Sequence, residues 1–110
     1  MERRYISRAP EFAMTVRSAG ADHELRLSGE LDIASAGCVR RALAHIGGRR
    51  VVMDVSGLRF IDAAGLSAIA LATQGRDGSR RVLSLRGARG LVRRVIELGE
   101  LGHLLDDAAA

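Results

Sequence analysis

Residues 51–55, with the sequence VVMDV, form a short and nearly continuous apolar run, and this run constrains the fold most. It is typical of a central strand in a parallel sheet that is covered on both faces. On either side of it, apolar residues recur at helical spacing, which predicts one helix before the strand and one after it. The preceding face is Ile33, Ala36, Val39, Leu43 and Ile46, and the following face is Leu66, Ile69, Ala70 and Thr73.

Shorter signals predict the remaining elements. Apolar and polar residues alternate over 14–16 and 25–27, which predicts a β-hairpin with a loop of about five residues at 18–22 and a second strand that ends at Gly29. Residues 82–85 predict a strand, residues 91–98 a third helix, and residues 101–105 a short last element. Arg93 and Glu97 lie at i, i+4 spacing on the solvent side of the third helix.

Capping residues place the ends of these elements. Asp32 and Asp62 are predicted to cap the first and second helices, because a carboxylate accepts hydrogen bonds from the free N–H groups there. Residues 47–48, Gly-Gly, are expected to end the first helix, and Ser56 with the glycine after it is expected to end the central strand.

The order β-β-α-β-α-β-α predicts a single α/β domain. We expect one mixed β-sheet with an opening hairpin, helices packed on it, and later strands made parallel by right-handed crossovers. Residues 1–12 carry charges and the only proline without periodicity, and are interpreted as a flexible leader. The domain is expected to span residues 13–105, and residues 106–110 to form a frayed tail.

The basic charge of the chain does not by itself predict nucleic-acid binding. The net charge is +4, but the 17 arginines are spread along the whole chain in dispersed pairs. Only 3% of the residues are aromatic, and no nucleic-acid-binding signature appears, so we expect no direct contact with nucleic acid. An acidic protein partner would explain the charge at least as well.

The sequence contains no arrangement typical of a cofactor site, a metal site or an enzyme. His23, His45 and His103 fall in different predicted elements, and the single Cys38 beside an apolar stripe is interpreted as a packed thiol. No signal peptide and no membrane-spanning apolar run is present. We expect a cytoplasmic, non-enzymatic protein without cofactor that is not inserted in a membrane and is a monomer or a weak dimer.

The most informative segment is DVSGLRFIDAAGL at residues 54–66. A buried strand leads through a short connection to Asp62, which opens a helix whose first turn is Ala63, Ala64 and Gly65. Small residues there allow a partner to approach the N–H groups at the helix start. The other interpretation of the same residues is a well-capped helix whose small side chains only relieve crowding.

This segment resembles the signature of the STAS domain, the fold shared by bacterial anti-sigma factor antagonists and the cytoplasmic tails of sulphate transporters. The family pattern is an apolar strand followed by Asp-x-Ser-Gly-x-x-Phe-Ile-Asp-Ser-Ser-Gly-Leu. Upstream, LSGELD at residues 27–32 is similar to the family's entry to its first helix, and downstream, LGEL at residues 98–101 is similar to its Leu-x-Gly-Leu helix end. The resemblance covers roughly residues 13–105.

The resemblance implies a regulatory switch that binds another protein. In such antagonists the partner is an anti-sigma factor with a kinase-type ATP-binding domain, and binding frees a sigma factor. The partner phosphorylates the second serine of the Asp-Ser-Ser-Gly motif, which breaks the complex. The resemblance then implies a partner-binding surface made of Asp32, Ser56, Asp62, Ala63, Ala64, Gly65, Leu66 and Ser67.

The chain departs from the family pattern at the phosphorylated position. Ala64 replaces the phosphoacceptor serine and Ala63 the serine before it, and alanine has no hydroxyl to accept a phosphate. Ser67, one turn further along the helix, is a weak substitute whose alternative interpretation is a small residue packed near the sheet. Ser56 is interpreted as a loop-stabilising hydroxyl, and Asp54 as a group that binds the backbone.

A second function stays open beside the antagonist. Stand-alone domains that resemble this family also bind the ATPase of bacterial ABC lipid-transport complexes, and some of those lack the serine pair. A neighbouring gene for a kinase or for a permease would discriminate between the two functions.

Overall fold

The computed structural model describes residues 2–6, 11–75 and 78–106 and contains one six-stranded sheet with the strands in the order β1-β2-β3-β4-β5-β6. The strands are β1 (Glu2–Ile6), β2 (Phe12–Ala19), β3 (Asp22–Leu31), β4 (Arg50–Ile61), β5 (Val82–Arg86) and β6 (Leu105–Asp106). The helices are α1 (Ala36–His45), α2 (Ala63–Leu71), α3 (Gly90–Leu98) and the 3-10 turn η1 (Gly102–Leu104).

The sheet is mixed, as the sequence predicts. Strands β1, β2 and β3 pair antiparallel, whereas β4 pairs parallel with both β3 and β5, and β5 pairs parallel with β6. This is the opening hairpin followed by parallel strands with intervening helices, and the predicted α/β fold class is confirmed. Among the described residues, no helix is long and apolar enough to span a bilayer.

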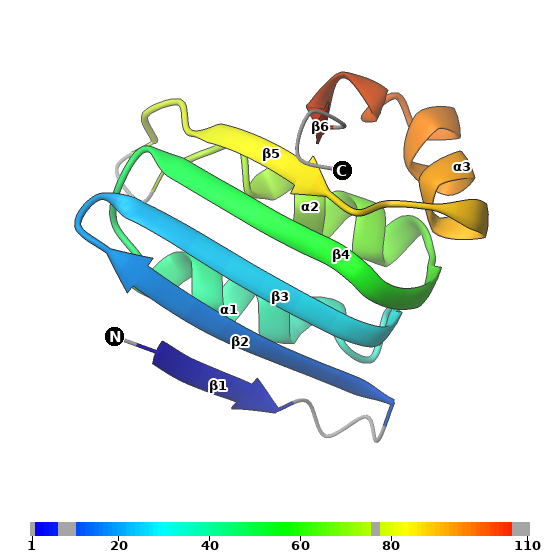
Figure 1. The fold of residues 1–110 in the computed structure, drawn as a ribbon, viewed down its shortest axis with the longest axis horizontal. Helices are drawn as coiled ribbons and strands as arrows, with labels where there is room; N and C mark the ends of the chain where they lie inside the picture. The colour runs from blue at the N-terminus through cyan, green and yellow to red at the C-terminus, as the bar shows by residue number, and fades with distance from the viewer. Residues whose placement is uncertain (1, 7–10, 76–77, 107–110) are drawn as a thin grey trace.

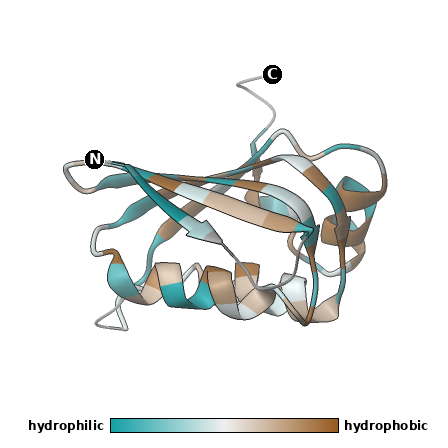
Figure 2. Ribbon diagram, turned by 90° about the horizontal axis from the view of Figure 1, so that it is seen from below, coloured by the Kyte–Doolittle hydropathy of each residue, from teal (hydrophilic) through white to brown (hydrophobic). Residues whose placement is uncertain are grey.

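Helices α1 and α2 lie side by side on one face of the sheet, behind it in Figure 1. Figure 2 shows that none of the helices in the described residues covers the opposite face, whereas α3 lies beside one end of the sheet. The core between sheet and helices is aliphatic and includes Leu25, Val39, Met53, Ile69 and Ile96, each fully or almost fully buried.

The prediction that residues 51–55 are covered on both faces is therefore wrong. Val51, Met53 and Val55 are buried, but the alternate residues Val52 and Asp54 are partly exposed on the face without helices. A strand is buried on both faces only when helices pack on both sides of its sheet, and here they pack on one side.

The prediction of a flexible leader over residues 1–12 is corrected over the residues that the structure describes. Glu2–Ile6 forms the edge strand β1, in register with residues 13–17 of β2, and Phe12 already begins β2. Its sequence ERRYI gives no apolar alternation, and charged residues are common on edge strands because they discourage pairing with another sheet. Residue 1 and residues 7–10 of the predicted leader lie outside the described part.

Several predicted element ends also differ. The hairpin turn has two residues, since Ala19 pairs with Asp22, and Gly20 adopts the positive φ of 62° that such a turn requires. Strand β3 continues past Gly29 to Leu31, and β4 continues past Ser56 to Ile61, because register shifts let the two strands stay paired.

Gly29 is required by space as well as by conformation. Its φ is +91°, and a Cβ atom there would lie 1.8 Å from the carbonyl oxygen of Glu11. The glycine that was interpreted as the end of a strand therefore marks a bulge inside it.

The first two helices are also shifted from their predicted faces. Helix α1 begins at Ala36 with Ser35 as N-cap, so Asp32 lies in the preceding turn and Ile33 is 81% exposed instead of packed in the core. In α2 the buried residues are Gly65, Ala68 and Ile69, whereas Ala70 is exposed. At the other end, Asp106 of the predicted tail pairs with Arg86 as part of β6, and residues 107–110 lie outside the described part.

Candidate functional site

The parallel strands bring two loops together at their carboxyl ends. Strand β3 ends at Leu31 and β4 at Ile61, and these two residues are paired. Asp32 and Asp62 follow directly, so the turn before α1 and the start of α2 lie next to each other. This end of a parallel sheet is where α/β proteins most often place their binding sites.

Asp62 holds the two loops in contact. Its Oδ1 accepts a hydrogen bond from the Gly65 N–H at 3.0 Å, which confirms Asp62 as the N-cap of α2. Its Oδ2 accepts from the Ile33 N–H at 3.2 Å, in the turn before α1. One carboxylate therefore fixes both the start of α2 and the position of Ile33.

Asp32 and Ser35 fix the turn from inside. Asp32 Oδ1 accepts hydrogen bonds from the Ala34 N–H at 2.9 Å and from the Ser35 N–H at 3.2 Å. The Ser35 hydroxyl, fully buried, donates to the Glu30 carbonyl at 2.8 Å and accepts from the Asp32 N–H at 2.9 Å. The turn is thus rigid, and it presents Ile33 to solvent.

The first turn of α2 lies very close to β3. A Cβ atom on Gly65 would lie 2.5 Å from the Leu31 carbonyl oxygen, so this position has room only for glycine. Ala63 is exposed and Ala64 is half-buried, so the first two residues of the helix present only methyl groups. We call Asp32, Ile33, Asp62, Ala63 and Ala64 the helix-start surface.

The structure brings most of the predicted site residues together, but not all of them. Asp32, Asp62, Ala63, Ala64 and Gly65 meet at the helix starts. Leu66 is half-buried, and a Cβ atom on Gly99, at the end of α3, would come within 2.8 Å of its Cδ1. Leu66 therefore packs between α2 and α3.

The two serines lie elsewhere. Ser67 is exposed on α2, so its interpretation as a residue packed near the sheet is wrong. Ser56 belongs to β4 and not to a loop, and its side chain lies on the face of the sheet without helices. Its hydroxyl donates to Asp54 Oδ1 at 2.6 Å and its backbone N–H donates to the same oxygen at 2.9 Å.

These contacts set the charge of Asp54. Partial burial raises the pKa of this carboxyl, but the hydrogen bonds from Ser56 and the nearby charges of Arg26 and Arg86 outweigh it, and the pKa lies below its usual range. The binding of the Ser56 backbone agrees with the role predicted for Asp54.

Ile33 is a surface residue, although its helical spacing with Ala36 and Val39 predicts that it packs in the core. The signal that could have excluded it is Asp32 followed by Ser35, because two capping residues in succession delay the start of the helix.

The other candidates for chemistry remain structural. Cys38 is buried; burial raises the pKa of its thiol, and Arg41 offsets this in part, so the packed thiol is confirmed. Within residues 2–6, 11–75 and 78–106, no three His, Cys, Asp or Glu side chains come close enough to hold a metal ion.

Comparison with known proteins identifies the class. The family model described as "Mlab, STAS domain" matches residues 14–106, and the chain therefore belongs to the STAS domain family. No curated protein sequence matches the chain.

Solved structures of the same fold include three anti-sigma factor antagonists. One is SpoIIAA in its unphosphorylated form, with a TM-score of 0.73, 18% identity, and coverage of 84% of this chain and 85% of that one. The antagonist from Mycobacterium paratuberculosis has a TM-score of 0.73 and 23% identity, and covers 93% and 91%. The STAS domain from Rhodobacter sphaeroides has a TM-score of 0.59 and 23% identity, and covers 71% and 88%.

Proposed function

We propose that this protein is an anti-sigma factor antagonist that binds an anti-sigma factor with a kinase-type ATP-binding domain and so frees a sigma factor. The observation that carries the proposal is the helix-start surface, which Asp62 holds rigid with one carboxylate. The solved antagonists with the same fold support it.

The chemistry of this surface suits a protein partner. Ile33 is 81% exposed and stands beside two alanines, so the surface offers an apolar contact with little side-chain entropy to lose. Both oxygens of Asp62 and the Oδ1 of Asp32 are already used within the protein. Binding at this surface therefore relies mainly on apolar packing and shape.

In this proposal the surface stays competent for binding at all times. Ala64 cannot accept a phosphate, so phosphorylation cannot end the complex at the position that the family uses. Control of the interaction then falls to the amount of partner, or to a hydroxyl such as that of Ser67, which is exposed on the same helix.

The alternative is a subunit that binds the ATPase of an ABC transport complex through the same surface. The observation that favours this alternative is the Ala63-Ala64 pair, since a transport subunit needs no phosphoacceptor.

The first experiment is affinity capture of the tagged protein from its own cells, with mass spectrometry of the bound proteins and a search for phosphate on Ser56 and Ser67. Recovery of an ATP-binding anti-sigma protein supports the antagonist. Recovery of an ABC ATPase with its permease favours the alternative, and recovery of neither contradicts both.

A charge at position 64 tests the surface itself. We expect Ala64→Glu to abolish binding of the captured partner, because it places an unpaired carboxylate in a desolvated apolar contact, a change that costs several kcal/mol. The measurement is titration calorimetry with purified partner. Ala44→Glu, an exposed alanine at the far end of α1, is the matched control and should bind normally. Equal affinity of the Ala64→Glu variant and the wild type would contradict the assignment of the helix-start surface as the partner-binding surface.

A further inference from the structure

The face of the sheet without helices contains a groove that the proposed function does not use. The groove has a volume of about 590 Å³, within the size range of small-molecule sites. It crosses β1, β2, β3 and β4, and its polar side chains are Arg4, Thr15, Arg26, Ser28, Asp54 and Ser56.

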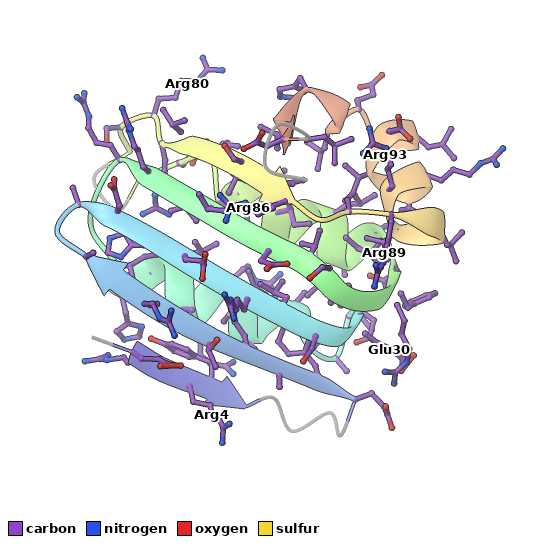
Figure 3. All side chains as sticks on the ribbon, viewed as in Figure 1. Arg4, Glu30, Arg80, Arg86, Arg89 and Arg93 are labelled. Carbon is purple, nitrogen blue, oxygen red and sulfur yellow. The ribbon has the colours of Figure 1, made fainter. Side chains whose placement is uncertain are left out.

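The strand register aligns four of these residues in one row. Arg4 pairs with Thr15, Thr15 with Arg26, and Arg26 with Asp54. Strands in a sheet lie about 4.8 Å apart, so Arg4 and Arg26 flank Thr15 with Cα atoms about 10 Å apart. Arginine side chains are long enough to meet over the threonine hydroxyl from both sides. Figure 3 shows Arg4 on the outermost strand, with its guanidinium pointing outward from the edge of the sheet, so this side chain turns inward when it reaches an anion over Thr15.

The two arginines of the row have N–H donors that are not engaged by other side chains of the row. Arg26 donates from Nε to Glu24 Oε1 at 3.1 Å, a contact that orients the guanidinium and leaves its terminal amino groups out of the ion pair. Among the residues that the structure describes, no hydrogen bond or ion pair holds the side chains of Arg4 or Thr15. An anion above Thr15 would thus find two guanidinium groups and one hydroxyl.

The other end of the groove offers acceptors and hydroxyls. Asp54 uses Oδ1 for Ser56, and its Oδ2 is left for a donor from a ligand. Within the described part of the chain, the Ser28 hydroxyl makes one long contact, at 3.5 Å, to the Ala13 carbonyl. These groups fit the hydroxyl groups of a polar ligand.

The charge balance selects the class of ligand. Glu24 is shared between Arg26, at 3.1 Å, and Arg86, whose Nη1 lies at 3.6 Å, and Asp54 lies beside both arginines. These two carboxylates balance the two arginines, and Arg4 leaves one positive charge in excess. A ligand with a single oxyanion group complements this charge.

We propose that the groove binds a small hydroxylated molecule that carries one oxyanion group, a phosphate or a carboxylate, with the anion over Thr15 between Arg4 and Arg26. The hydroxyl groups of the ligand lie toward Ser28 and Asp54. This proposal does not rest on the partner or on the helix-start surface, which lies at the carboxyl ends of the strands.

Amide chemical shifts in ¹H–¹⁵N NMR spectra test the proposal on the intact chain. The probes are ribose 5-phosphate and gluconate, with ribose as the uncharged control, each at millimolar concentration. We expect at least one of the two anionic probes to shift the amides of Thr15, Arg26 and Ser56, and ribose to shift none. Absence of shifts with both anionic probes, or shifts confined to residues 63–65 at the start of α2, would overturn the site.

Two substitutions and a matched control complete the test. Arg4→Gln and Thr15→Val should each weaken binding about tenfold, the effect of one lost charge-assisted hydrogen bond. Arg50→Gln removes an exposed arginine of β4 that lies outside the groove and for which no ion pair is found among the described residues, and should bind normally. If all three variants bind as the wild type does, the anion is not held by Arg4 and Thr15 and the proposal fails.

Discussion

At the scale of single residues, Asp62 connects the fold to the helix-start surface. Its two carboxylate oxygens accept hydrogen bonds from residues that are far apart in sequence, Gly65 at 3.0 Å and Ile33 at 3.2 Å. Only the first of these bonds is the ordinary capping bond that a sequence predicts. The second bond places Ile33 beside α2, and it depends on the pairing of β3 with β4.

Removal of the Asp62 carboxylate should lower stability and release the turn that contains Ile33. We expect Asp62→Ala to lower the free energy of unfolding by about 1–2 kcal/mol, because the cap of α2 is lost. The measurement is urea unfolding followed by circular dichroism. Asp22→Ala, an exposed aspartate in the hairpin whose side chain makes no hydrogen bond among the described residues, is the control and should change stability little. A cost as small as that of the control would contradict the capping role.

At the scale of elements, β4 presents the family signature at two places, its carboxyl end and one face of the sheet. Its last residues lead into Asp62 at the carboxyl end, whereas Asp54 and Ser56 point to the face without helices. On that face Asp54 joins strands β3, β4 and β5 electrostatically, since Arg26 and Arg86 stand on its two neighbours. The motif therefore supports both the sheet and the start of α2.

This arrangement predicts how stability depends on pH. The pKa of Asp54 is lower in the folded protein than in the unfolded chain, so the folded state binds the proton less readily. The resulting stabilisation is complete above the unfolded pKa of about 3.9 and is lost as the pH falls through the folded value. We expect Asp54→Asn to be less stable than the wild type at neutral pH and to lose less stability on acidification. Urea unfolding between neutral pH and pH 3 measures the difference, and parallel pH profiles of the two proteins would contradict the prediction.

At the scale of the whole molecule, the sheet has one face covered by helices, long central strands and short edge strands. The central pair β3 and β4 is long and supplies fully buried residues such as Leu25 and Met53. The outer strands β1 and β6 are short, with five residues and two residues. Stability is therefore expected to fall from the centre of the sheet to both edges.

Hydrogen exchange should show this gradient. We expect the amides of β3 and β4 to exchange slowest, close to the rate set by global unfolding, and those of β1 to exchange much faster through local opening. The measurement is native-state exchange by NMR. Equal protection of β1 and β4 would instead mean that the edge strand unfolds only together with the core.

The sequence predicts most of the fold but only part of the surface. The alternation of apolar spacing predicts the element order and the parallel strands, and Asp62 predicts the N-cap of α2. The small residues after Asp62 leave two interpretations open, and the close approach of Gly65 to the Leu31 carbonyl supports relief of crowding at that position. The sequence pattern misses β1, because a charged edge strand has no apolar period, and it places Ile33 in the core, because periodicity does not show where a helix begins. It also places Ser56 in a loop, although pairing with β3 extends β4 beyond it.

By itself, the sequence determined what depends on local chemistry: the alternation of strands and helices, the cap at Asp62, the glycine at 65, and the absence of a hydroxyl at position 64. The tertiary structure decided what depends on strand pairing. The pairing of β3 with β4 places Asp62 beside Ile33, and the register of the three strands β1, β2 and β3 places Arg4 and Arg26 on either side of Thr15. Residues so far apart along the chain are brought together by hydrogen bonds between strands, and local sequence patterns do not predict which residues those bonds pair.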